Sequence, residues 1–295
     1  MAFDFYFAGT QCEEANELMR TLNANVLKSY VNDKKEILKW FENKKNGWKG
    51  KLMIDNGAFT FHRHGGSLDI DEYIKWINDN DEYIDYAIAL DAIPGKWGMT
   101  RTSQDIIDAA EQTWKNFNYM VEHTNSPKKL LPVFHMGENF EYLRRYLNEF
   151  EGLEYMCISG SKDLTNSQRE HWYERCWYEI KHSKNPNIKV HCLGSATMSN
   201  VKKFPFTSMD ATSWIMTGAN GSILTEKGAI YVGSRIRLNA MEYEAVHNIV
   251  SKYGMTVEQV MEDYKARMVV NVHYLYDISQ LVETNYSTVI KRRLF

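Results

Sequence analysis

The chain has 295 residues, of which 44% are hydrophobic and 25% charged, so it is neither a disordered segment nor a membrane bundle but a globular protein with a full core. The formal net charge of −3 excludes a generally cationic nucleic-acid binder and leaves only local basic patches for phosphate contacts. No apolar stretch approaches the ~20 residues of a membrane span, and the first residues, MAFDFYFAGTQCEE, lack the pattern of a signal peptide.

We therefore expect a cytoplasmic protein without membrane contact, in the host cytoplasm if a phage encodes it. The cysteines are Cys12, Cys157, Cys176 and Cys192, which form no C-x-x-C pair and no Cys/His cluster of zinc-binding spacing. Buried thiols are the prediction, because a reducing cytoplasm disfavours disulfides.

Apolar runs with strand character alternate with amphipathic segments along most of the chain. The predicted strands are 3–8, 51–55, 86–91, 130–135, 155–159, 188–193, 206–210 and 229–232. The clearest predicted helices between them are 70–78, 103–121 (with Ser103 as N-cap), 140–150 and 167–181. Eight strands with intervening helices are typical of a (β/α)8 TIM barrel, and a doubly wound open sheet is the alternative.

Two parts of the chain fit this pattern less well. The connection from residue 9 to residue 50 is long, and the last predicted strand follows a hairpin-like segment. Beyond residue 235 the pattern is helical, most clearly over 241–253 and 257–276. We predict a single domain over 1–295, with the barrel in about 1–235 and a helical C-terminal annex in about 236–295.

Three aspartates each stand at the end of an apolar run. Asp55 ends KLMID, Asp91 ends YAIALD, and Asp210 ends FTSMD. Because the carboxyl ends of parallel strands meet at one end of a barrel, we expect the three carboxylates to converge there. For Asp55 and Asp91, capping of the following turn is the structural alternative. A buried carboxylate at Asp210 is costly unless it is paired, hydrogen-bonded or functional.

Other strand ends carry small or polar residues suited to a ligand. A histidine at such a position hydrogen-bonds a ligand or transfers a proton, backbone N–H groups bind a carbonyl or phosphate oxygen, and an aromatic ring forms the wall of a flat pocket. These candidates are Phe59, His135, Ser159, Gly160, Leu193 and Gly194. Each of these types also occurs at a barrel rim without any function.

Two further sets of residues suggest ligands of other kinds. Lys202, Lys203, Arg235 and Arg237 are candidate phosphate contacts, although short basic runs are usually solvated surface. A metal-dependent barrel hydrolase is a separate hypothesis, in which His62, His64, His135, His191 and Asp210 are the ligands. A surface loop is the preferred interpretation of His62 and His64.

The order of these motifs resembles the tRNA-guanine transglycosylase family. Asp-Asn-Gly-Ala-Phe at 55–59 resembles the D-S-G-G-[YF] segment of the family, and Leu90-Asp91 followed by Pro94 resembles its base-recognising aspartate segment. Residues 208–210 resemble the segment that carries the nucleophile. The remaining matches are 133–137 at V-Q-G, 158–160 at G-G-L, 193–194 at M-G, and 220–221 with 228–230 at the N-G-x-x-F-T…I hairpin, so that the similarity covers about 50–235.

The resemblance implies a two-step base exchange. Asp210 would attack the anomeric carbon of a guanosine and expel guanine, Asp55 would transfer the proton of the departing or incoming base, and Asp91 would bind the amino and ring N–H edge. Such a covalent glycosyl-enzyme needs no metal and no cofactor. The implied base pocket contains Phe59 and Leu193 on the two faces of the base, Ser159 and Gly160 at its carbonyl edge, Gly194, and His135 in place of a glutamine.

The departures from the family are informative about the polynucleotide. The zinc motif C-x-C-x-x-C with a later histidine is absent, since no cysteine follows Cys192, and residues 217–220 contain none of the arginines of the corresponding loop. The chain is more similar to the compact DNA-modifying (DpdA-type) branch, which implies DNA and a free 7-deazaguanine base as partners. Transfer RNA and a non-catalytic DNA-binding barrel are the alternatives; the choice of 7-deazaguanine and the oligomeric state stay open.

Overall fold

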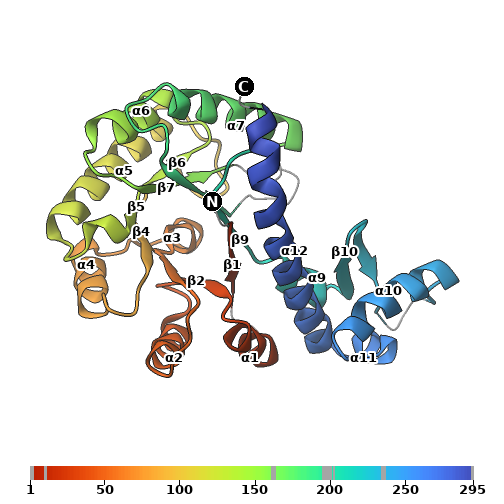
Figure 1. Ribbon diagram of the computed structural model, residues 1–295. Coiled ribbons are helices and arrows are strands. Elements are labelled where there is room, and N and C mark those ends of the chain that lie inside the picture. Colours follow the sequence, from red (N-terminus) through yellow and green to blue (C-terminus); the bar gives the residue numbers. More distant parts are fainter. Residues whose placement is uncertain are drawn as a thin grey trace.

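The centre of the molecule is a parallel, barrel-like sheet (Figure 1). The computed structural model describes residues 3–9, 12–160, 164–194, 201, 203–233 and 237–293, with side chains up to residue 281. In this part of the chain the sheet has nine strands in the order β5-β4-β3-β2-β1-β9-β8-β7-β6. The strands are β1 (Asp4–Ala8), β2 (Asn25–Ser29), β3 (Leu52–Asp55), β4 (Tyr86–Ile88), β5 (Leu130–Leu131), β6 (Val133–His135), β7 (Tyr155–Ser159), β8 (Lys189–Leu193) and β9 (Ser208–Ala211).

The two ends of this strand order meet in one segment of the chain. β5 pairs with β4 and β6 pairs with β7, yet only Pro132 separates β5 from β6. Proline has no backbone N–H, so it interrupts the ladder, while the carbonyl of Pro132 still accepts a hydrogen bond from Cys157 N at 2.8 Å. The sheet is therefore nearly closed, and the fold is TIM-barrel-like.

One predicted strand lies outside this sheet, and one strand of the sheet lacks a prediction. Residues 229–232 belong to β11 (Gly228–Tyr231), which pairs only with β10 (Ser222–Thr225) in an antiparallel hairpin. Their predicted place in the barrel was wrong, and β2, from the long first connection, takes it. Lys28 in the middle of β2 hides the strand pattern, because it is a charged residue that is fully buried.

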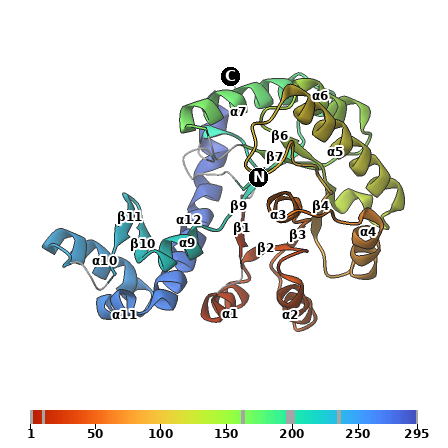
Figure 2. The same ribbon diagram turned by 180° about the vertical axis from the view of Figure 1, so that it is seen from behind.

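Helices cover the outside of the sheet (Figure 2). α5 begins one residue after its N-cap, Thr102, which forms a capping box with Asp105, so the predicted N-cap at Ser103 was off by one position. These outer helices are α1 (Glu13–Thr21), α2 (Lys34–Lys45), α4 (Ile70–Asp79), α5 (Ser103–His123), η1 (Pro127–Lys129), α6 (Phe140–Glu149), α7 (Asn166–Lys181) and α9 (Ser213–Ala219). The short helix α3 (Ala58–His64) follows the carboxyl end of β3, and none of its residues is buried.

The C-terminal helices form a second, smaller core with the hairpin. They are α10 (Ala240–Lys252), α11 (Val257–Glu262) and α12 (Tyr264–Arg293), and they bury Ile223 of β10 together with Val246 and Val260. Arg267 of α12 donates a hydrogen bond to the carbonyl of Gly218 at 2.8 Å, which ties this helix to α9. The predicted helix 257–276 is thus two helices, divided at Asp263.

Apolar side chains fill the inside of the sheet below its carboxyl end. Side chains two positions apart in a strand point to the same face. Asp55 therefore faces the same side as Met53, which is part of this interior cluster, and Asp210 the same side as Ser208. The cluster consists of Tyr6, Ala8, Leu27, Met53, Ile88, Leu131, Val133, Tyr155 and Cys157. No helix of the described residues is long and apolar enough to cross a membrane.

Candidate active site

Three carboxylates interact at the carboxyl end of the sheet. Asp55 ends β3, Asp91 lies just after β4, and Asp210 lies in β9. Burial, together with the negative charges of Asp91 and Asp210, raises the pKa of Asp55 to about 7. Burial and the charges of all three aspartates also raise the pKa of the Cys157 thiol on β7. The three carboxylates thus act on one another and on a common neighbour.

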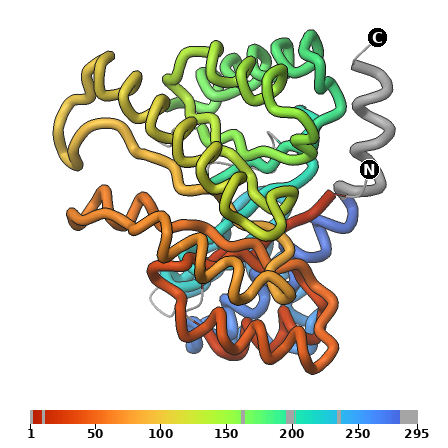
Figure 3. Tube along the Cα trace, turned by 90° about the vertical axis from the view of Figure 1, so that its left-hand side faces the viewer, coloured from red at the N-terminus to blue at the C-terminus, as the bar shows by residue number. Residues whose placement is uncertain are grey.

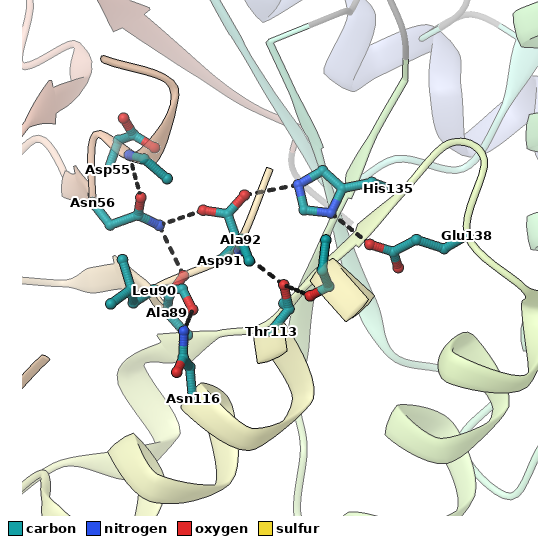
Figure 4. A network of polar contacts seen from close by, with 12 residues as sticks. Asp55, Asn56, Ala89, Leu90, Asp91, Ala92, Thr113, Asn116, His135 and Glu138 are labelled. Carbon is teal, nitrogen blue, oxygen red and sulfur yellow. Dashed lines mark hydrogen bonds and ion pairs between the residues drawn. The ribbon is translucent and has the colours of Figure 1, made fainter. Parts of the chain in front are cut away.

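Asp91 is held by a chain of polar side chains (Figure 4). Asn56 donates through Nδ2 to Asp91 Oδ1 at 2.9 Å and to the carbonyl of Ala89 at 2.8 Å. On the other side, His135 Nε2 lies 2.8 Å from Asp91 Oδ2, and His135 Nδ1 lies 2.9 Å from Glu138 Oε1. Both oxygens of Asp91 are fixed, so its carboxylate has one orientation.

The hydrogen bonds around Asp91 also determine the protonation states of His135 and Asp91. Burial opposes protonation of His135, but the hydrogen bonds to Asp91 and Glu138 and the charges of these two groups together outweigh burial and raise the pKa of His135 to about 10. Burial likewise disfavours the ionised form of Asp91, yet the hydrogen bond and charge of His135 and the hydrogen bond from Asn56 together lower the pKa of Asp91. At neutral pH an imidazolium therefore lies between two carboxyl groups, and Asp91 is an acceptor only.

Asp210 is positioned by the backbone of the neighbouring strand end. Gly194 N donates to Asp210 Oδ1 at 2.7 Å, and His191 Nε2 lies 3.4 Å from the same oxygen. Gly194 has a φ of 65°, the left-handed region that favours glycine. Within the described residues Oδ2 has no hydrogen-bond partner. One oxygen of Asp210 is thus anchored by the backbone.

His191, which lies beside Asp210, belongs to a series of buried polar contacts. His191 Nδ1 contacts Ser208 Oγ, which in turn contacts the hydroxyl of Tyr155. His191 and Ser208 are fully buried. His191, which the metal hypothesis assigns as a ligand, therefore lies behind Asp210 and has one ring nitrogen facing a hydroxyl.

The other predicted pocket residues lie around these carboxylates. His135, Ser159 and Leu193 are register partners across β6, β7 and β8, so they form one row at the sheet end, with Gly160 and Gly194 next in the chain. Phe59 lies on α3, is 56% exposed, and contacts Trp97 edge-on at 5.5 Å between ring centroids. The Phe59 ring is therefore largely exposed to solvent in this structure.

Two of the four predicted phosphate contacts belong to the residues that the structure describes. Lys203 forms an ion pair with Glu170 at 2.6 Å, and Arg237 is exposed. Lys202 and Arg235 lie outside the part of the chain that the structure describes.

His62 and His64 of the metal hypothesis lie on α3. Among the residues that the structure describes, no group of three or more His, Cys, Asp or Glu side chains has the arrangement of a metal site. All four cysteines are buried, as predicted.

Sequence reasoning assigned no role to Asn56 and Glu138. Both are buried polar residues, Asn56 fully and Glu138 to 8% exposure. Buried polar groups normally have hydrogen-bond partners, and here these partners are Asp91 and His135. The available signals were weak: Asn56 directly follows Asp55, and Glu138 follows His135 after a turn at Gly137 with a φ of 105°.

Replacing Glu138 with glutamine should lower the pKa of His135 below its value of about 10. Glutamine keeps an acceptor for Nδ1 but removes one of the two charges that stabilise the imidazolium. The stability that protonated His135 contributes is complete below its usual pKa of 6.5 and lost as pH rises through the folded value. The variant should therefore lose that stability at lower pH than the wild type.

Histidine side-chain NMR titration checks this, with exposed His171, which has no contact with Glu138, as internal control. An unchanged His135 titration in the variant would show that Glu138 does not hold the imidazolium.

The comparisons with known proteins assign no family. No family model matches the sequence, and no curated protein matches it. Among solved structures, malate synthase of Haloferax volcanii in its lead(II) complex is similar with a TM-score of 0.41 and 8% sequence identity, over 99% of this chain and 95% of that chain. Similarity at this level assigns no function.

Proposed function

We propose that the chain is a DNA-guanine transglycosylase that exchanges guanine in DNA for a 7-deazaguanine through a glycosyl ester of Asp210. The observation that carries the proposal is Asp55, whose pKa of about 7 results from burial and from the charges of Asp91 and Asp210. A carboxyl group that is half protonated at neutral pH is suited to give a proton in one step and take one in the next.

In the first step, Asp210 Oδ2 attacks C1′ of the target nucleotide as the bond from C1′ to guanine N9 breaks. Protonated Asp55 supplies the proton that the departing guanine takes up. In the second step, Asp55 as carboxylate removes the N9 proton of the incoming base, N9 attacks C1′, and the ester to Asp210 breaks. The proton and the carboxylate return to their starting states, so no cofactor or metal is needed.

Recognition of the base follows from the fixed charge of Asp91. Each carboxylate oxygen has two lone pairs, and Asn56 and His135 use one on each oxygen. The remaining lone pairs accept the ring N–H and amino donors of guanine and of 7-deazaguanine, which share this edge. In this proposal Ser159 and Gly160 contact the carbonyl edge, while Phe59 and Leu193 flank the base.

We further propose that the sheet is a (β/α)8 barrel in which β5 and β6 count as one interrupted strand. The helices in about 236–295 then form an annex at the place of the zinc subdomain of the tRNA-guanine transglycosylase family. The target nucleotide leaves the base stack to reach Asp210. DNA and a free base are the partners, the cytoplasm is the location, and tRNA is the alternative polynucleotide.

Incubation of the purified protein with radiolabelled guanine and either DNA or tRNA tests this proposal. We expect acid-precipitable label in DNA and none in tRNA, followed by release of that label when excess 7-deazaguanine is added. Label in tRNA alone would replace the polynucleotide and keep the chemistry. Label in neither nucleic acid, from folded protein, would contradict the proposed function.

A further inference from the structure

Two segments that follow the aspartates of the candidate site contact each other. One is 57–68, which contains α3 and follows Asp55; the other is 92–102, which follows Asp91. Trp97 joins them, since its ring lies 5.5 Å from that of Phe59 and 6.0 Å from that of His62 between centroids. Figure 3 shows both segments projecting on the same side of the molecule, in orange and gold.

The meeting point has a positive charge of its own. Arg63 lies 5.6 Å from the centroid of the Trp97 ring. Burial and the charge of Arg101 lower the pKa of His62, so Arg101 also lies close to α3. We call Arg63, Lys96, Trp97 and Arg101 the rim patch.

The cations of the rim patch are available to a ligand. Arg63, Lys96 and Arg101 are exposed, and within the described residues none of them forms an ion pair with a carboxylate. Residues 57–68 and 92–104 contain no Asp or Glu, although the whole chain has a net charge of −3. By contrast, Lys203 is already neutralised by Glu170 at 2.6 Å.

The same place exposes large apolar side chains. Trp97 is 50% exposed, Phe59 56% and Met99 68%. Unpaired cations interleaved with exposed aromatic rings are the arrangement by which proteins hold an unpaired strand, with phosphates on the cations and bases stacked on the rings. A purely apolar protein partner would leave three cations desolvated without a counter-charge.

We propose that the rim patch binds an unpaired nucleic-acid strand, with a base stacked on Trp97 and phosphates on Arg63, Lys96 and Arg101. This rests on the proposed function for one detail, namely that the bound nucleotides flank the target base above Asp55 and Asp91. Strand binding itself requires neither a guanine nor turnover.

The test uses the full chain and a fluorescein-labelled oligothymidine, which contains no guanine to exchange. Fluorescence anisotropy of Trp97→Ala should show binding about tenfold or more weaker than wild type, because one stacked base contributes on that scale. The matched control is Tyr243→Ala, an exposed aromatic (45%) on α10 outside the patch, which should bind as wild type. Equal melting temperatures of the variants establish that each is folded.

A second arm measures the cations. With Arg63, Lys96 and Arg101 all changed to alanine, the slope of log Kd against log salt should fall by about 2, since a single strand gives ~0.7 per phosphate contact. Oligouridine in place of oligothymidine distinguishes RNA from DNA as the strand that is bound.

Three results would overturn the inference: equal affinity of Trp97→Ala and wild type, duplex bound as tightly as single strand, or an acidic peptide that competes equally at matched charge. Strand binding that is lost in Trp97→Ala, in a protein that exchanges no base, would contradict the proposed function and leave this inference standing.

Discussion

Replacement of Asp210 by asparagine is expected to reduce guanine exchange into DNA by at least about 10³-fold while leaving the fold intact, as loss of a covalent nucleophile does. The side-chain oxygen of asparagine still accepts the hydrogen bond that Gly194 N makes to Oδ1 at 2.7 Å. What is lost is the negative charge on the second oxygen, without which no glycosyl ester forms. Incorporation of radiolabelled guanine measures the rate.

Covalent trapping distinguishes this result from mere damage to the site. Wild-type protein denatured during turnover should carry DNA that survives denaturing electrophoresis, and Asp210→Asn should carry none. Asp108→Asn is the matched control, because Asp108 is an exposed aspartate on α5 that accepts a hydrogen bond from Gln104 at 2.8 Å. Exchange at the wild-type rate by Asp210→Asn, or an adduct formed by it, would exclude Asp210 as nucleophile.

The second large effect is expected for Asp55→Asn, which should slow exchange by about 10²- to 10⁴-fold, the usual contribution of a positioned general acid or base. In the wild type the two half-reactions should depend on pH in opposite directions. Release of guanine needs the protonated acid and should fall as pH rises through about 7, whereas capture of the incoming base needs the carboxylate and should fall below about 7. Single-turnover rates measure each half separately.

The same variant should be more stable than the wild type at high pH. The pKa of Asp55 is raised from 3.8 to about 7, so the wild type loses folding free energy as pH rises from about 3.8 to about 7, because the unfolded chain ionises there and the folded chain does not. The cost is complete above about pH 7, and asparagine never incurs it. We expect the free energy of unfolding of Asp55→Asn to exceed that of the wild type by about 2 kcal/mol at pH 8 and by less at pH 4.5. This value is smaller than the full pKa shift gives, because Asp55 is partly accessible to solvent. Urea unfolding at the two pH values measures this. A gain that is the same at both would mean that Asp55 has an ordinary pKa.

Local pattern was sufficient for most of the framework of the fold. The predicted strands over 3–8, 51–55, 155–159 and 188–193 lie within one residue of β1, β3, β7 and β8. Each is a run of apolar residues buried on both faces, which is the strongest signal that a parallel strand leaves in a sequence. The position of Asp55 follows from the second of these runs, and that of Asp210 from the predicted strand 206–210, which overlaps β9.

Local pattern gave the wrong result at two strands. It missed β2, which contains a buried lysine, and it assigned residues 229–232 to the barrel. Lys28 is fully buried in β2, donates through Nζ to the carbonyl of Gly9, and lies 5.5 Å from the Trp40 ring centroid. Burial lowers its pKa to about 8. No local rule anticipates a lysine that is accommodated in this way. Residues 229–232 have a strand pattern of their own, but it is the antiparallel partner, β10, that decides their sheet.

The sequence by itself determined the alternation of strands and helices and placed Asp55, Asp91 and Asp210 at strand ends, because strand character depends on residues that are neighbours along the chain. Only the tertiary structure decided that these carboxylates share one environment, that His135 is a cation held between Asp91 and Glu138, and that Trp97 meets Arg63. Those properties arise from charges and surfaces brought together from separate strands, and their strength depends on burial and distance, which exist only in the folded chain.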